Sequence, residues 1–234
     1  MNKQGRLIVL DGLDGCGKST QFELLTRRMQ DEKIPVLPIS FPDYDHPSSA
    51  LVKLYLNGEI SPHAGDVNAY AASSFYAVDR YASFKRCWEQ PYRSGATILA
   101  SRYVTSNAIH QMSKLPRQEW DAYLDWLSAY EYDKLELPRP DLVLFLDMPV
   151  SVSQQLLYTR YHGDEAKKDI HESDVAYLEQ CRAGALYAAQ QQGWQVIACS
   201  DGNQPLTVEA IGAQIWKAVC DKTDVTVSPD TTGR

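Results

Sequence analysis

Short apolar runs alternate along this chain with longer stretches in which apolar residues recur at helical spacing. The apolar runs are nearly continuous, which is typical of strands buried on both faces of a parallel sheet. The predicted strands are Arg6–Asp11, Val36–Ser40, Thr97–Ser101, Leu142–Asp147 and Val196–Ser200. The predicted helices are Lys18–Gln30, Ser48–Leu56, Asp66–Trp88, Ser106–Lys114, Arg117–Leu127, Val150–Thr159, Ser173–Gln192 and Thr207–Cys220.

This alternation of strands and helices predicts the fold class. We expect an α/β fold in three layers, with a five-stranded parallel sheet flanked by helices on both faces. The 234 residues favour a single domain, which we expect over residues 1–220. Asp66 is the expected N-cap of the third helix. Residues 160–172 are charged and poor in large aliphatic side chains, and residues 221–234 are small and polar, so we expect a mobile loop and a flexible tail.

Charge, hydropathy and cysteine content limit the binding partners and the cellular compartment expected for this protein. The formal net charge is −7, which disfavours a general coat of nucleic acid or anionic membrane but leaves room for a local basic pocket. No stretch approaches ~18 uninterrupted apolar residues, so no membrane-spanning helix is expected. The five cysteines are widely spaced without a CxxC pair, and the N-terminal apolar run is too short for a signal peptide. These features favour a protein of the reducing cytoplasm.

Residues 12–19 read GxxxxGKS, between a predicted strand and a predicted helix. That context is the one in which a phosphate-binding loop forms, because glycines let backbone N–H groups point at phosphate oxygens. Lys18 would reach the β- and γ-phosphates of ATP, and Ser19 would contact Mg²⁺. The predicted ATP-binding residues are Gly12, Leu13, Asp14, Gly15, Cys16, Gly17, Lys18, Ser19 and Thr20. The loop indicates a nucleoside-triphosphate site but specifies no reaction.

From residue 5 to about residue 220 the chain resembles the thymidylate kinases, which phosphorylate dTMP. The segments that carry the resemblance are VLDGLDGCGKSTQ, FPDY at Phe41–Tyr44, FYAVDR at Phe75–Arg80, SRYVTSNAIHQ at Ser101–Gln111, LVLFLDMPV and WQVIACSDG. Their order and spacing are more specific than any one of them. The resemblance implies a P-loop kinase fold with a short lid over residues 160–172, Mg²⁺ and ATP as cofactors, dTMP as acceptor, and a homodimer.

The acceptor site can be read in part from residue chemistry. A carboxylate inside the phosphate loop would repel phosphate, so Asp14 should point outward, to a sugar hydroxyl or to solvent. Arg80 beside aromatic residues suits a flat base, and Arg102 after the third strand suits a phosphate at the carboxyl edge of the sheet. The alternatives are core packing for the aromatics and a surface ion pair for Arg102.

The resemblance assigns these residues more closely. It implies that Asp14 holds the deoxyribose 3′-OH, Arg80 the thymine O4, and Arg102 the acceptor phosphate. It implies that Tyr76 stacks on the base, that Phe75 faces elsewhere on the helix, that Tyr103 packs under the sugar and that Asn107 bonds the pyrimidine edge. The dTMP-binding set is Asp14, Phe41, Tyr44, Phe75, Tyr76, Arg80, Arg102, Tyr103, Asn107 and Gln111.

The chain departs from the family pattern at two points. The Asp that usually precedes Arg102 is Ser101, which leaves the metal side short of a carboxylate. Asp11 at the end of the first strand is the expected substitute, directly or through water, so the expected metal-site residues are Ser19 and Asp11. The second departure is Asp43-Tyr44, where many relatives carry an Arg; the Tyr44 hydroxyl could still bond the acceptor phosphate.

A lid cation is expected because Gly15 leaves the phosphate loop without a basic side chain other than Lys18. In the family such a glycine goes with a basic lid, and Arg160, Lys167 and Lys168 lie in the lid segment. A cation that arrives on closure would stabilise the charge of the transferring phosphoryl group. The expected catalytic residues are Lys18, Arg102, Arg160 and Asp11.

Two other function classes remain open from the sequence. A kinase for another nucleoside monophosphate or for a deoxynucleoside would share the loop, and in a deoxynucleoside kinase Asp11 would be the base near the 5′-OH. A P-loop switch or ATPase is the third class, although the chain lacks the guanine-reading NKxD motif.

Overall fold

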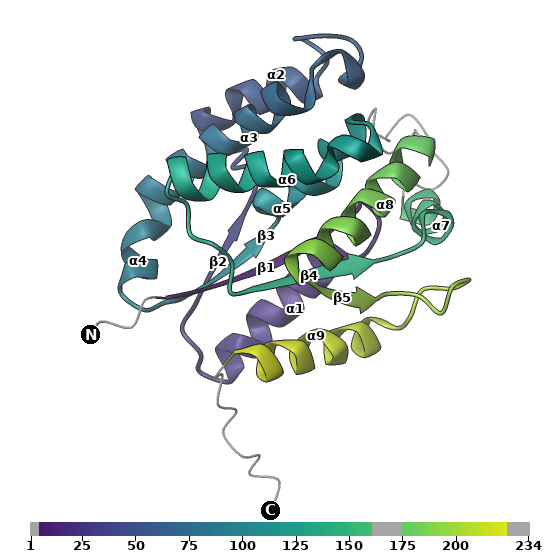
Figure 1. The fold of residues 1–234 in the computed structure, drawn as a ribbon. Coiled ribbons are helices and arrows are strands. Elements are labelled where there is room, and N and C mark those ends of the chain that lie inside the picture. The colour runs from purple at the N-terminus through teal and green to yellow at the C-terminus, as the bar shows by residue number, and fades with distance from the viewer. Residues whose placement is uncertain (1–4, 161–174, 224–234) are drawn as a thin grey trace, which may run out of the picture.

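A parallel five-stranded sheet lies between two layers of helices (Figure 1), in a computed structural model that describes residues 5–160 and 175–223. The strands are β1 (Arg6–Gly12), β2 (Val36–Ser40), β3 (Thr97–Ser101), β4 (Leu142–Asp147) and β5 (Gln195–Ala198). Their order across the sheet is β2-β3-β1-β4-β5, and all neighbouring pairs are parallel. The predicted fold class is therefore confirmed.

The helices of the described residues connect successive strands and cover both faces of the sheet. They are α1 (Lys18–Asp31), α2 (Ala50–Leu56), α3 (Ala69–Ser83), α4 (Glu89–Arg93), α5 (Val104–His110), α6 (Trp120–Ser128), α7 (Val150–Arg160), α8 (Val175–Gln192) and α9 (Val208–Lys222). Two π-helical turns extend them, Phe84–Trp88 after α3 and Ala129–Lys134 after α6. No helix within the described ranges is long and apolar enough to cross a membrane.

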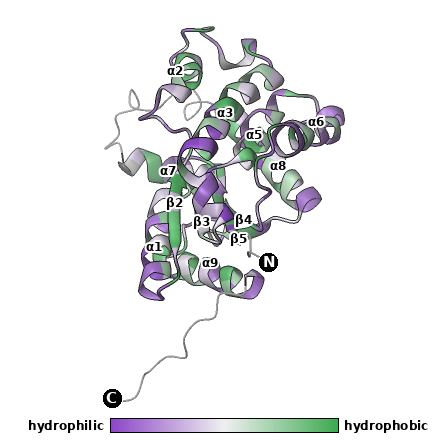
Figure 2. Ribbon diagram, turned by 90° about the vertical axis from the view of Figure 1, so that its left-hand side faces the viewer, coloured by the Kyte–Doolittle hydropathy of each residue, from purple (hydrophilic) through white to green (hydrophobic). Residues whose placement is uncertain are grey.

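The core has two halves because side chains of each central strand alternate between the faces. Leu7 and Val9 of β1 join a cluster with α3, α5, α6 and α8. Ile8 and Leu10 join a second cluster with α1 and α9 on the opposite face. Both faces of β1, β3 and β4 are covered, which is why their sequences read as continuous apolar runs. In Figure 2 β2 carries hydrophobic colours, and turns of α1 and α6 carry hydrophilic ones.

The third helix begins later than predicted. It starts at Ala69, and its N-cap is Asn68, whose Oδ1 accepts a hydrogen bond from the Ala71 amide at 2.9 Å. Asp66 instead lies in a 3₁₀ turn, where it accepts a hydrogen bond from Ser61. The prediction was wrong because two acidic or amide residues of similar capping strength lie within three positions, and the sequence pattern does not choose between them.

In the C-terminal half, the observed ends of β5 and α9 differ by a few residues from the predicted ones. β5 ends at Ala198, because Ser200 already leaves the sheet to form an isolated bridge with Pro205. α9 continues through Lys222, so the helix takes in two residues of the segment expected to be a flexible tail. Arg160 is the last residue of α7. The rest of the expected lid and the tail beyond residue 223 lie outside the described residues.

Candidate active site

The phosphate loop joins the carboxyl end of β1 to α1. Gly15 and Gly17 have φ values of 78° and 84°, a region that residues with a Cβ rarely adopt, and Gly17 is the N-cap of α1. Lys18 Nζ donates a hydrogen bond to the Gly12 carbonyl at 3.0 Å, so this side chain folds back across the loop. Leu13 and Cys16 turn into the core, whereas Ser19 and Thr20 are exposed in the first turn of α1.

Gly15 has no room for a side chain. A Cβ at this position would lie 3.0 Å from the Ser153 carbonyl oxygen and 3.0 Å from Leu157 Cγ, both on α7. The close approach of α7 gives a physical reason for the absence of a basic side chain here. It also joins the phosphate loop to the helix that ends at Arg160.

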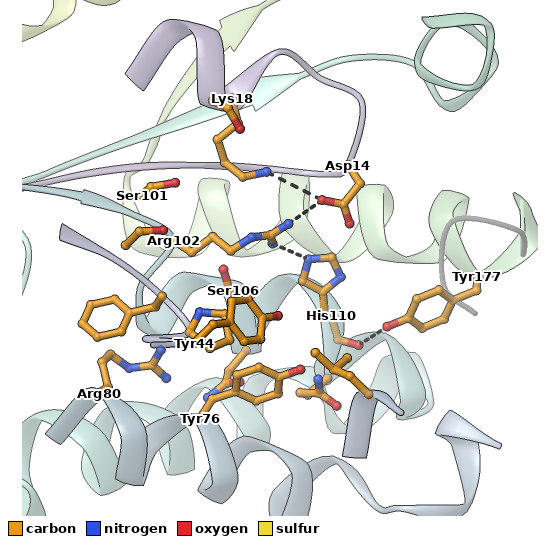
Figure 3. Close-up of a pocket in the computed structure, with 17 residues that line it drawn as sticks. Asp14, Lys18, Tyr44, Tyr76, Arg80, Ser101, Arg102, Ser106, His110 and Tyr177 are labelled. Atoms are coloured by element: carbon orange, nitrogen blue, oxygen red, sulfur yellow. Dashed lines mark hydrogen bonds and ion pairs between the residues drawn. The ribbon is translucent and has the colours of Figure 1, made fainter. Parts of the chain in front are cut away.

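A pocket of about 350 Å³ opens beside the loop and runs from Lys18 to α3 (Figure 3). That volume is in the range of small-ligand sites. The lining residues come from the carboxyl edge of the sheet and from α1, α2, α3, α5 and α8. They are Asp14, Lys18, Ser19, Ser40, Phe41, Pro42, Tyr44, Leu56, Tyr76, Arg80, Ser101, Arg102, Ser106, Asn107, His110, Gln111 and Tyr177.

Arg102 forms the cationic end of the pocket together with Lys18. Its Nη2 donates to Asp14 Oδ1 at 2.5 Å, and its Nη1 lies 3.1 Å from His110 Nε2 (Figure 3). Burial lowers the pKa of Arg102, but the carboxylates of Asp14 and Asp11 more than offset this, so its pKa is raised and its charge is permanent. The residue has a φ of 65°, and such strained backbone is concentrated at functional sites.

Asp14 lies on the pocket wall between the two cations. Its Oδ1 accepts from Arg102 and lies 3.9 Å from Lys18 Nζ. The carboxylate therefore points toward the cationic end of the pocket rather than away from it. Binding of a sugar hydroxyl by Asp14 stays a prediction.

Asp11 does not have the position expected of a metal ligand. It is fully buried and does not line the pocket. Its Oδ2 accepts from Thr105 Oγ1 at 2.6 Å and Ser106 Oγ at 2.7 Å, and its Oδ1 accepts from the Gly12 amide at 2.8 Å. The expectation that Asp11 holds the metal directly is wrong for this geometry, because the carboxylate is buried and does not line the pocket. Asp11 instead ties the start of α5 to the phosphate loop.

The far end of the pocket holds a buried polar network. Arg80 Nε and Nη2 donate to the two oxygens of Glu131 at 2.7 and 2.8 Å, and Nη1 donates to the Tyr103 carbonyl at 3.1 Å. Asn107 Nδ2 donates to Glu131 at 2.9 Å and to the Ser73 carbonyl at 3.2 Å. Burial lowers the pKa of Arg80, but the Glu131 carboxylate reverses the shift, so Arg80 stays charged. Glu131, an acid that the sequence analysis missed, thus brings Arg80 and Asn107 together, and their contact with a base stays a prediction.

Two of the predicted aromatic contacts are not on the pocket wall. Tyr103 is fully buried, and its hydroxyl donates to the Pro138 carbonyl at 3.0 Å, so the expectation that it packs under a sugar is wrong. Phe75 packs on Tyr55, with ring centroids 6.3 Å apart, and faces away from the pocket. Phe41, Tyr44, Tyr76 and Gln111 do line it. Burial raises the pKa of Tyr76, so its ring is neutral.

Among the pocket residues that the sequence analysis did not assign are Ser106, His110 and Tyr177. Ser106 and His110 are four positions apart on α5, on one helix face, which is a signal the sequence contained. Tyr177 comes from α8 and donates to the His110 carbonyl at 3.0 Å. Lys167 and Lys168 lie outside the described residues, and so does the side chain of Arg160. Among the residues described, no three His, Cys, Asp or Glu side chains gather as a metal site.

Comparison with known proteins assigns the family. The sequence model of the thymidylate kinase family matches residues 10–211, which is most of the chain. This chain belongs to the thymidylate kinase family. A thymidylate kinase from Mycobacterium tuberculosis is 30% identical over 191 residues, covering 80% of this chain and 87% of the relative. A probable thymidylate kinase from Pyrobaculum aerophilum is 26% identical over 212 residues, covering 91% and 96%.

The fold agrees with that of a solved thymidylate kinase. The structure of the enzyme from Candida albicans superposes with a TM-score of 0.70 at 21% identity, covering 97% of this chain and 96% of the other. The sheet, the phosphate loop and the pocket at the carboxyl edge of the sheet are thus set in a thymidylate kinase fold, and the protein is a phosphotransferase of that family.

Proposed function

We propose that this protein transfers the γ-phosphoryl group of ATP to dTMP, giving ADP and dTDP. One observation carries the proposal beyond family membership. A single pocket joins the phosphate loop at Lys18 to a buried base-sized end at Arg80 and Asn107, with Arg102 between them. A nucleoside monophosphate fits this order of groups, with its phosphate beside Arg102 and its base at the far end.

The transfer needs little covalent help from the protein. The acceptor phosphate is already anionic near neutral pH, so positioning and charge neutralisation can supply the rate. Arg102 binds the acceptor phosphate, and its ion pair with Asp14 and its contact with His110 aim the planar guanidinium along the pocket. Lys18 leaves the Gly12 carbonyl to reach the β- and γ-phosphates of ATP. Arg160 is the proposed cation that joins them from the end of α7.

Mg²⁺ fits this site through Ser19. Its side chain is on the pocket wall in the first turn of α1, beside Lys18, where a hydroxyl and phosphate oxygens together suit a hard cation. Mg²⁺ would neutralise charge on the phosphates of ATP when bound. Since Asp11 is buried and does not line the pocket, we propose Ser19, phosphate oxygens and water as the ligands.

The burial of Asp11 also argues against a deoxynucleoside kinase. Such an enzyme needs a carboxylate base near the 5′-hydroxyl of its substrate. Asp11 is closed off from the pocket, and Asp14, which does line it, is paired with Arg102. Arg102 in that pair favours a phosphate over a hydroxyl at this point of the pocket.

A homodimer in a reducing compartment completes the proposal. Leu51 and Leu54 on α2 and Val78 and Tyr81 on α3 are exposed large apolar side chains, on two helices that pack together at one end of the molecule (Figure 1). Such faces are typical of subunit interfaces. All five cysteines are free, which supports a cytoplasmic location.

The function is tested by ADP release across a panel of acceptors. We expect kcat/KM for dTMP to exceed that for dCMP, dGMP and AMP by about two orders of magnitude or more, because mismatched polar groups in a buried pocket are costly. dUMP lacks only a methyl group and should be used measurably. Equal turnover of dGMP or AMP would contradict the assignment.

A further inference from the structure

Glu131 lies in the π-helical turn Ala129–Lys134 and is 0% exposed. Its two carboxylate oxygens accept three hydrogen bonds, two from Arg80 and one from Asn107. Both donors line the pocket, whereas Glu131 does not. One buried acid therefore holds the two side chains proposed to bind the base.

Glu131 fixes which atom Asn107 can offer to a ligand. The two acceptors around the Asn107 amide nitrogen are a carboxylate and the Ser73 carbonyl, and neither of these can donate. An amide turned the other way would set its oxygen against both, so this orientation is required by chemistry. Both N–H groups of Asn107 are spent, and only its Oδ1 remains, a hydrogen-bond acceptor.

Arg80 is complementary to Asn107 in this respect. Three of its N–H groups are bound, two by Glu131 and one by the Tyr103 carbonyl. A guanidinium has five N–H groups and no acceptor, so what Arg80 can offer is donors only. The base end of the pocket therefore presents donors from Arg80 and one acceptor from Asn107.

We propose that Glu131 is a positioning residue that makes this site select a 4-oxo pyrimidine over a 4-amino pyrimidine. A 4-oxo base has a carbonyl at C4 and N3–H, which match the Arg80 donors and the Asn107 acceptor. A 4-amino base has an amino group at C4 and a bare N3, so donor meets donor and acceptor meets acceptor. This inference rests on the proposed function, because it takes the acceptor to be a pyrimidine monophosphate whose base reaches Arg80 and Asn107.

The test is Glu131→Gln assayed with dTMP, dUMP and dCMP. The introduced amide has one acceptor oxygen, and whichever way it lies its NH₂ group faces at least one N–H of Arg80, so Arg80 and Asn107 lose their fixed placement. We expect the ratio of kcat/KM for dTMP over dCMP to fall about tenfold. The ratio for dTMP over dUMP should not change, because these bases have the same 4-oxo edge. A merely structural role would lower all three values in parallel and leave both ratios unaltered.

Two further variants separate positioning from general damage. Tyr123→Phe removes a hydroxyl that bonds Ser73 Oγ and the Asn107 backbone carbonyl, but leaves the Asn107 amide alone. It should keep the dTMP/dCMP ratio of the wild type. Glu131→Asp keeps the charge and should recover part of the ratio, and it replaces Glu131→Gln if that variant does not fold by circular dichroism.

The coupling of Glu131 to Asn107 decides the mechanism. In an Asn107→Ala background, Glu131→Gln should cause a smaller further fall in the dTMP/dCMP ratio than it causes in the wild type, because one of the two side chains through which Glu131 acts is gone. A parallel loss with unchanged ratios in Glu131→Gln and Glu131→Asp would overturn the inference. If the wild type itself turned over dCMP as well as dTMP, the base assignment of the proposed function would fail instead, which is a different result.

Discussion

The carboxylate of Asp11 illustrates how a buried charge can be part of a site without touching its ligands. Thr105, Ser106 and the Gly12 amide donate to it, and Arg102 Nη1 lies 4.0 Å away. A carboxyl group at this depth is tolerable because protein donors bond both of its oxygens. Its role is to hold together the phosphate loop, α5 and Arg102.

Asp11→Asn should therefore act on stability more than on the metal. The amide would turn an N–H toward at least one of the present donors, and we expect a loss of about 2 kcal/mol in the free energy of unfolding. The Mg²⁺ concentration for half-maximal rate should stay close to that of the wild type, and Ser101→Ala should be mild in both measurements. Urea denaturation and a Mg²⁺ titration check this, and a large rise in the Mg²⁺ requirement at unaltered stability would restore Asp11 as a ligand.

Burial of Lys114 makes the stability of the fold depend on pH. Its Nζ donates to Tyr55 Oη at 2.7 Å and to the Val67 carbonyl at 3.1 Å, and burial lowers its pKa to about 8. The unfolded chain keeps its usual higher pKa, so between these two values the unfolded state binds more protons and stability rises with pH. Above the pKa of the unfolded chain, Lys114 is neutral in both states and its burial no longer destabilises the fold. As the pH falls to about 8 and below, the buried amine becomes charged and the full destabilisation returns.

Comparison of wild type with Lys114→Met isolates this term from other titrations. As the pH rises from about 8 to about 10.5, the unfolding free energy of the wild type should increase by about 2 kcal/mol relative to that of the variant. Denaturant melts of both proteins across that range measure the difference. A difference that did not change with pH would mean that the Lys114 pKa is ordinary.

The sequence predicted those site residues that lie within short, recognisable motifs. The phosphate loop, Arg80, Arg102 and Asn107 were found from motifs, and they line one pocket. Tyr103 was assigned to the sugar from the resemblance to the family, yet its ring is turned into the core. Glu131 and Tyr177 were missed, because the sequence gives no sign of which distant helix closes over a pocket.

At the level of elements, the strands were easier to predict than the helices. β3 and β4 have the predicted bounds, since burial on both faces leaves an uninterrupted apolar run that ends sharply, and the edge strand β2 also has the predicted bounds. The helices blend into 3₁₀ and π-helical turns at their ends, as at Phe84–Trp88 and Ala129–Lys134, and no residue pattern marks these changes. Glu131 lies in one of those π-helical turns, so the same lack of a residue pattern left both the turn and the position of Glu131 unpredicted.

The contact of the phosphate loop with α7 depends on the absence of a side chain at Gly15. Gly15→Ala would combine a positive φ with a methyl group 3.0 Å from the Ser153 carbonyl and from Leu157. We expect a loss of about 1–3 kcal/mol in stability and a weaker affinity for ATP, because α7 or the loop must shift. Thermal unfolding and ATP titration measure these effects. As a control, Gly58→Ala has a similar φ of 73° without a close neighbour and should cost stability but leave ATP affinity unchanged.

Arg160 ends α7, one turn beyond the Leu157 that lies against the loop. Since the loop has no basic side chain other than Lys18, an interaction made by Arg160 with the transferring phosphoryl group would act on the chemical step more than on binding. We expect Arg160→Ala to lower kcat by about two orders of magnitude, with little change in dTMP affinity. Lys167→Ala and Lys168→Ala should be milder. Single-turnover kinetics check this, and an unaltered rate for Arg160→Ala would remove it from the mechanism.

On the scale of the whole molecule, the site depends on the sheet topology. β1 and β3 are neighbours, so the phosphate loop after β1 and Arg102 after β3 emerge side by side at one edge. The crossover helices α3 and α5 then bring Arg80 and Asn107 under the same opening. A negative net charge is compatible with this because the cations that matter are concentrated in one pocket.

The outer faces of α2 and α3 give the proposed dimer its test. Val78 on α3 is 49% exposed, and a charge there would have to be buried without a partner in an interface formed by these helices. We expect the wild type to elute in light-scattering chromatography at twice the 26.3 kDa chain mass, and Val78→Glu to elute at the mass of one chain. Val208→Glu is the matched control: Val208 is 41% exposed at the start of α9, on the opposite face of the sheet, and the variant should remain a dimer. If Val78→Glu elutes with the wild type, the subunits meet elsewhere, and if both variants become monomeric, the added charge acts on the fold as a whole rather than on this face.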